Sequence, residues 1–173
     1  MRNREKIGWV LGGILAVSFS AMAGEPSVKV TAIPKTDPIK KKSANEVAIQ
    51  ELSGIYKVVV KNVSFMDVTP PLTAQYRVFV RRDDGMKQAR DVKPQRFVGD
   101  ATVEAIKPGG SATFETKEVK LRHTSLDTGY YYSNGKQSST RDELAGVWVR
   151  IYADGKMIAE YMSSSNLPRN GAF

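Results

Sequence analysis

The side chains best suited to catalysis lie at and just after His123, the only histidine of the chain. Ser125 and Asp127 follow it closely, and a hydroxyl, an imidazole and a carboxylate together form the set used in nucleophilic catalysis. Catalytic triads are assembled by folding rather than by closeness in sequence, and the chain contains no G-x-S-x-G motif. We therefore expect His123 to have a surface or packing role, and we expect the protein not to be an enzyme.

The chain lacks the residues that other kinds of catalytic or metal site need. Zinc sites normally use more than one histidine or cysteine, and this chain has one histidine and no cysteine. No G-x-x-x-x-G-K-[ST] phosphate loop is present. Asp67, Asp100 and Glu104 could serve as paired carboxylates in glycoside hydrolysis, but that reaction needs a substrate cleft. The D-D-G sequence at 83–85 is typical of a turn rather than of a calcium site. We expect no catalytic residue, metal or cofactor.

The segment 128–140 has the composition of a recognition loop. Three consecutive tyrosines cannot all point into a core, because neighbouring side chains of a strand face opposite sides. An Asn-Gly turn signal and a polar return arm follow them. Tyrosine provides large contact area at low entropy cost. Two interpretations stay open: a binding surface, or a strand pair whose tyrosines pack on neighbouring strands. The candidate binding residues are Tyr130, Tyr131, Tyr132, Asn134, Lys136 and, from a later strand, Trp148.

The first 23 residues have the layout of a secretory signal peptide. Three basic residues precede an apolar run over 7–19, and Ala21-Met22-Ala23 is a small-x-small cleavage site. The mature chain is expected to begin near Gly24, in the periplasm or at the cell surface. After Gly24 no apolar run approaches the roughly 18 residues that a spanning helix needs.

The mature chain is basic. The whole sequence has 26 basic and 18 acidic residues, and the signal peptide contains three and one of them, which leaves a net charge of +6. Such a balance favours acidic partners such as anionic glycans, lipid headgroups or an acidic protein. The run Lys40-Lys41-Lys42 either attracts an anionic surface or is a solvated linker. Because an exported protein does not meet nucleic acid as its normal partner, we expect no nucleic-acid binding.

Short alternating stretches separated by turn residues predict an all-β fold. With frequent turns and no convincing helical period, the pattern favours an immunoglobulin-like β-sandwich of about seven to eight antiparallel strands. Strands are expected over 28–33, 54–63, 72–82, 97–106, 111–121, 146–152 and 157–161.

The clearest hairpin joins the last two expected strands. Asp154-Gly155 lies between them, and Asp-Gly is a strong hairpin signal. Val147, Val149 and Ile151 form a purely β-branched face, which we expect to lie in the core.

Several segments and boundaries follow from composition alone. Residues 34–45 are expected to form an exposed polar connection, 47–52 a short strand or a turn of helix, and 139–145 one helical turn. The sandwich domain would span 24–166, followed by a flexible tail at 167–173.

Two stretches resemble parts of known bacterial proteins. Residues 106–114 (IKPGGSATF) resemble the Pro-Gly turn and alternating strand of bacterial immunoglobulin-like and fibronectin-like sandwiches. Residues 144–167 are similar to the last hairpin of small exported proteins in Verrucomicrobia-type bacteria, where some immunoglobulin-like proteins are encoded with type IV pilus genes. The resemblance implies a non-enzymatic accessory or adhesion role and transfers no functional residue.

Export, composition and resemblance together predict a non-enzymatic binding protein of the bacterial cell envelope or surface. Its partner would be another envelope or surface protein, such as a pilus component, or a second copy that adds to an uncovered strand edge. The alternative is a carbohydrate-binding module in which Tyr130, Tyr132 and Trp148 form an aromatic platform for a glycan.

Overall fold

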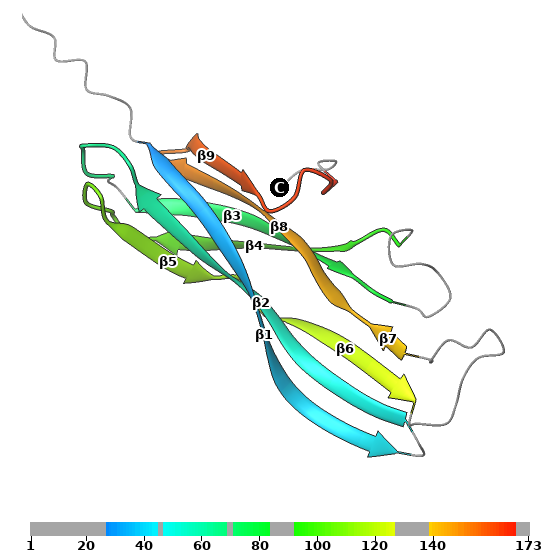
Figure 1. The fold of residues 1–173 in the computed structure, drawn as a ribbon. Coiled ribbons are helices and arrows are strands. Elements are labelled where there is room, and N and C mark those ends of the chain that lie inside the picture. The colour runs from blue at the N-terminus through cyan, green and yellow to red at the C-terminus, as the bar shows by residue number, and fades with distance from the viewer. Residues whose placement is uncertain (1–26, 45–46, 69–70, 84–91, 127–138, 169–173) are drawn as a thin grey trace, which may run out of the picture.

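The computed structural model describes residues 27–44, 47–68, 71–83, 92–126 and 139–168, and the expected signal peptide lies outside this part of the chain. All of the secondary-structure elements in the described part of the chain are β-strands (Figure 1). The nine strands are β1 (Val28–Ala44), β2 (Val47–Asn62), β3 (Leu72–Arg81), β4 (Gln95–Val103), β5 (Ser111–Glu115), β6 (Val119–Leu126), β7 (Ser139–Arg141), β8 (Glu143–Ala153) and β9 (Lys156–Met162).

The strands form two antiparallel sheets. One sheet has five strands. Four of them lie in the order β1-β2-β6-β7, and the fifth, β5, pairs with a different part of β2 from the part that pairs with β6. The other has four strands in the order β4-β3-β8-β9. This arrangement confirms the prediction of an all-β sandwich, with nine described strands in place of seven or eight.

Alternation along the strands places one apolar face of each sheet in the core. Every second residue of β2 from Leu52 to Asn62 is buried, as the period of a strand with one buried face requires. Val147, Val149 and Ile151 of β8 are fully buried, which confirms the predicted core face. They pack in one cluster with Tyr56 of β2 and with residues of β3.

The stretch expected as a polar connection is the second half of a strand. Residues from Pro34 to Ala44 pair with β2 between Val47 and Tyr56, with a register shift between Pro38 and Lys40. Two prolines are tolerated because β1 is an edge strand: on its unpaired side no backbone N–H is needed to donate a hydrogen bond to a neighbouring strand. The ambiguous stretch 47–52 is part of β2.

The helical turn expected over 139–145 is absent from the structure. Residues 139–141 form β7, which pairs with β6, and β8 begins at Glu143 and pairs with β3. The local capping pattern therefore yields to pairing with two neighbouring strands, because strand contacts outweigh the weak preference of so short a helix.

The hairpin between β8 and β9 turns as the sequence predicts. Asp154 and Gly155 have φ angles of 48° and 76°, so both central residues are in the left-handed region that a two-residue type I′ turn requires.

The two sheets separate at one end of the molecule. In Figure 1 the halves of β1 and β2 that lie beside β6 run away from the four-stranded sheet. Among the described residues, Leu52 and Leu121 are the last buried core pair on the inner face of β2 and β6, and the next pair on that face, Gln50 and His123, is partly exposed.

Candidate functional site

A row of polar side chains crosses the inner face of the five-stranded sheet beyond its apolar part. Adjacent members are cross-strand partners on four consecutive strands, and directly opposite residues project from the same face. We call this set the polar row; it consists of Lys41, Gln50, His123 and Arg141. Gln50 and His123 lie two residues beyond Leu52 and Leu121, so the row continues the core face after its apolar part ends.

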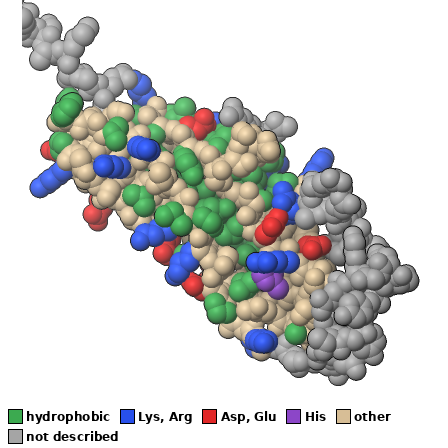
Figure 2. All heavy atoms as spheres, in the orientation of Figure 1, with side chains coloured by type: hydrophobic (Ala, Val, Ile, Leu, Met, Phe, Trp, Pro, Cys, Tyr) green, Lys and Arg blue, Asp and Glu red, His purple; other side chains and the backbone are tan. Residues whose placement is uncertain are grey.

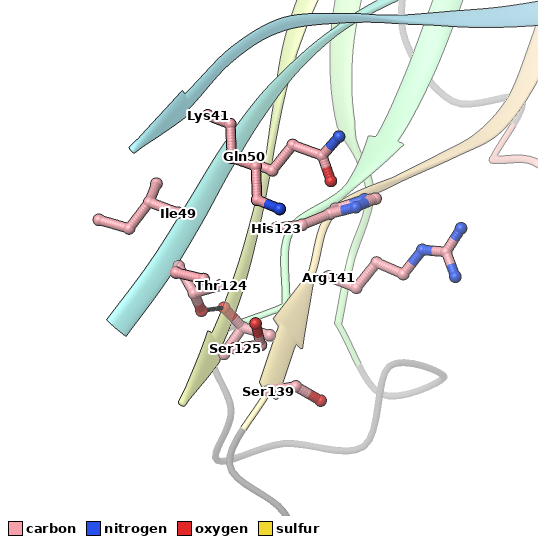
Figure 3. Close-up of a pocket in the computed structure, with 10 residues that line it drawn as sticks. Lys41, Ile49, Gln50, His123, Thr124, Ser125, Ser139 and Arg141 are labelled. Carbon is pink, nitrogen blue, oxygen red and sulfur yellow. Dashed lines mark hydrogen bonds between the residues drawn. The ribbon is translucent and has the colours of Figure 1, made fainter. Parts of the chain in front are cut away.

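Two shallow hollows meet at the row. The first has a volume of about 330 Å³ and contains all four members of the row together with small polar residues such as Ser125 and Ser139. The second, about 430 Å³, shares His123 and Arg141 with the first and reaches across to Leu144 of the other sheet. Figure 3 shows Gln50 and His123 on one side of the sheet and Ile49 pointing to the opposite side.

The chain passes from one sheet to the other beside this row, at Asp142. Asp142 is 7% exposed and lies between β7 of one sheet and β8 of the other. Its Oδ2 accepts hydrogen bonds from Arg82 Nη1 at 2.6 Å and from the backbone N–H of Arg122 at 3.0 Å, and its Oδ1 accepts from the N–H of Asp83 at 3.2 Å. One carboxylate therefore joins β6, the end of β3 and the strand that changes sheets.

The same residue orients the histidine of the row. Nε2 of His123 lies 2.9 Å from the carbonyl oxygen of Asp142, and a carbonyl only accepts, so the ring proton is on Nε2. In the neutral imidazole this makes Nδ1 an acceptor.

The row carries positive charge at both ends. Lys41 and Arg141 are exposed, and among the described residues no ion pair joins a carboxylate to either side chain. Figure 2 shows basic side chains beside the histidine at this end of the molecule. Asp83 accepts from the backbone N–H of Arg141 at 3.1 Å. The row can thus offer N–H donors and positive charge to an anionic group.

The predicted tyrosine site lies outside the described residues. Tyr130, Tyr131, Tyr132, Asn134 and Lys136 all belong to 127–138. This segment joins Leu126 of β6 to Ser139 of β7, and Ser125 pairs with Ser139 at the end of the row. Chain connectivity therefore attaches the tyrosines directly to the strands that carry His123 and Arg141.

Trp148 is covered by side chains of its own chain. It is 3% exposed, and the Cζ atoms of Arg77 and Arg150 lie 5.1 Å and 4.7 Å from its ring centroid. Its Nε1–H donates to Glu160 Oε1 at 3.0 Å. The expected aromatic platform needs an open ring face, so Trp148 does not fill that role in this arrangement.

The C-terminal segment completes this second cluster. Leu167, the first residue of the expected tail, is buried and packs with Phe79 and Trp148 on the outer side of the four-stranded sheet. Packing therefore continues one residue past the expected domain boundary at 166.

Over the described residues, no three histidine, cysteine or acidic side chains are grouped so that they could hold a metal ion. The same residues include no helix of the length and apolar character needed to cross a membrane.

No protein-family model matches the chain, and no curated protein is significantly similar to it. Three solved structures resemble it weakly. A structural-genomics target is 12% identical, with a TM-score of 0.34, and the match covers 85% of this chain and 94% of that one. A putative ApaA protein from Bordetella pertussis is 13% identical, with a TM-score of 0.34 and coverage of 84% and 97%. A protein from Akkermansia muciniphila is 11% identical, with a TM-score of 0.31 and coverage of 82% and 73%.

The sequence marks two members of the polar row but gives no sign that the four belong together. In the sequence, Lys41 belongs to the run Lys40-Lys41-Lys42 and His123 stands near Ser125 and Asp127, while no motif marks Gln50 or Arg141. These residues become neighbours only through the register of four strands. A sequence signal existed in β2, where the inner-face pattern changes from apolar to polar between Leu52 and Gln50.

Proposed function

We propose that this protein is an exported, non-enzymatic binding protein of the bacterial cell envelope, and that its polar row contacts an acidic segment of another envelope protein. The alignment of Lys41, Gln50, His123 and Arg141 across one sheet face, in a hollow formed by the described residues, is the observation that carries the proposal. A pilus or adhesion accessory role is one form that this function can take.

The spacing of the row suits an extended acidic segment. Strands of a sheet are about 4.8 Å apart, so Lys41 and Arg141 are separated by roughly 14 Å across three strand spacings. Carboxylates four residues apart on an extended peptide are separated by about 13.6 Å. Gln50 and His123 lie between the two cations and offer polar contacts to the peptide between its carboxylates.

The row is also held in place before a partner arrives. Its residues lie on paired strands, and Asp142 ties β6 to the strand that carries Arg141. A surface that is already ordered loses little conformational entropy on binding, which favours recognition. The net positive charge of the mature chain adds long-range attraction for acidic partners.

A charge-reversal experiment tests the proposal. The mature chain, residues 24–173, is titrated with a fluorescent glutamate-rich peptide whose acidic residues recur every four positions. We expect Lys41→Glu combined with Arg141→Glu to weaken binding at least tenfold, and the wild-type affinity to fall as salt is raised. Lys57→Glu, which reverses an exposed lysine further along β2, is the matched control and should bind nearly as well as the wild type.

Cross-linking in the native envelope tests the proposal with the biological partner. Recovery of an acidic envelope protein by the wild type, and its loss in the double variant, would support the proposal. Equal recovery by both would overturn the role of the row. Binding to a neutral glycan that is unchanged by the double variant would favour the carbohydrate-binding alternative.

A further inference from the structure

Strand β4 is an edge of the four-stranded sheet that contains no proline, lysine or bulge. Among the described strands it pairs only with β3. Edge strands are normally guarded by proline, lysine or a bulge. Strand β1, the edge of the other sheet, contains Pro34, Pro38 and several lysines, whereas β4 contains neither residue type. Val98, in the middle of β4, is 54% exposed.

The outer face of β4 has a charge pattern that is complementary to itself. Arg96 and Asp100 lie two residues on either side of Val98, all three on the same face of the strand. When two copies of β4 pair antiparallel with Val98 opposite Val98, each Arg96 lies opposite the Asp100 of the other copy. Opposite charges in directly opposed positions stabilise a strand pair. Registers centred on Phe97 or Gly99 lose this match.

The inner face of β4 offers a matching apolar contact. In the same register Phe97 of one copy lies opposite Gly99 of the other. Gly99 has no room for a side chain of its own, because a Cβ atom there would lie 2.4 Å from the Tyr76 hydroxyl oxygen. The Tyr76 side chain already covers Gly99, so the Phe97 ring of the other copy would approach Tyr76.

A hollow of about 320 Å³ runs along this edge. Its lining includes Tyr76, Phe97 and Val98 from the four-stranded sheet and Val119 from β6. The Tyr76 hydroxyl accepts a hydrogen bond from the N–H of Lys117 at 2.9 Å, which holds the far wall in place. The hollow provides space for the Phe97 ring of an incoming copy.

We propose that the mature protein forms a two-fold symmetric dimer through the β4 edge, joining two four-stranded sheets into one continuous sheet of eight strands. The interface is isologous, since the same residues serve both partners. It uses a different sheet from the polar row and is independent of the function proposed above.

A charge exchange tests the register. Sedimentation velocity on the mature chain should show a dimer, and Arg96→Asp or Asp100→Arg alone should raise its dissociation constant at least tenfold. The double variant R96D/D100R should restore the dimer, because the exchanged charges oppose each other again. Lys57→Glu, on the other sheet, should leave the dimer intact. Circular dichroism checks that each variant is folded.

Cysteine trapping tests the two-fold axis without depending on charge. The chain has no cysteine, so any disulfide must come from an introduced residue. Antiparallel partners have Cα atoms about 4.5–5.5 Å apart, within disulfide range. Val98→Cys should therefore cross-link to itself on mild oxidation, whereas Thr102→Cys, on the same face but opposite position 94 of the other copy, should not. A wild type that stays monomeric, a folded double variant that stays monomeric, or equal cross-linking at both positions would overturn the proposal.

Discussion

The Nε2–H of His123 donates a hydrogen bond to the carbonyl oxygen of Asp142, 2.9 Å away, at the point where the chain leaves one sheet for the other. The buried carboxylate of the same aspartate accepts from Arg82 and from two backbone N–H groups. Asp142 therefore links the candidate binding row to the join between the sheets, and damage to the join should reach the row.

Replacing Asp142 by alanine should lower the free energy of unfolding by about 2–4 kcal/mol, because a buried charged acceptor is lost and its donors are left without it. Urea denaturation of the mature chain measures this loss. Asp142→Asn retains one acceptor oxygen and should cost less than the alanine variant. Equal stability of the wild type and Asp142→Ala would show that the network is dispensable.

Asn62→Ala should destabilise the opposite end of the sandwich by about 2–4 kcal/mol. Asn62 is fully buried, and its Nδ2 donates to the carbonyls of Met66 at 2.7 Å and Ile106 at 2.9 Å, while its Oδ1 accepts from the N–H of Ser64 at 2.9 Å. Asn62→Asp keeps an acceptor but removes both donors. We expect it to be destabilised as well, and an aspartate variant as stable as the wild type would contradict the assigned donor role.

Stability should fall above pH 10 because of Tyr56. Burial, with a smaller contribution from Tyr161, raises the pKa of Tyr56 from 10.0 to about 12. The folded state then keeps a proton that the unfolded state loses, so this stabilising contribution is complete below pH 10 and is lost as the pH rises to 12. The loss is of order 2–3 kcal/mol.

The measurement for Tyr56 is the free energy of unfolding between pH 9 and 12. Tyr56→Phe is the control, because it removes the Tyr56 hydroxyl and leaves the rest of the chain unchanged. The variant should show a shallower decline than the wild type, and parallel curves would contradict the expected role of burial.

Leu167→Ala should loosen the C-terminal segment from the outer face of the four-stranded sheet. Burial of Leu167 against Phe79 and Trp148 predicts a loss of about 2–3 kcal/mol. Trp9 lies in the expected signal peptide, so Trp148 is the single tryptophan of the mature chain and reports directly on this cluster. Its emission should shift to longer wavelength in Leu167→Ala and stay unchanged in Pro168→Ala, its half-exposed neighbour. Identical spectra for both variants would contradict this packing.

Local patterns in the sequence determined the strands and the tightest turn. The stretch 54–63 predicted a strand, and the β-branched face of Val147, Val149 and Ile151 predicted both a strand and its buried side. Asp154-Gly155 predicted the hairpin. These features depend on residues close together in the chain, since the period of a strand and the φ angles of a two-residue turn are local properties.

Tertiary structure alone decided how the strands are aligned and what their polar residues meet. The second half of β1 exists because β2 pairs with it, and Trp148 is enclosed by Leu167 and by the arginines of its own sheet. Lys41 and Arg141, a hundred residues apart, belong to one row only through the register of four strands. Register is set by contacts between distant segments, and a shift of one residue would turn every side chain of a strand to the other face.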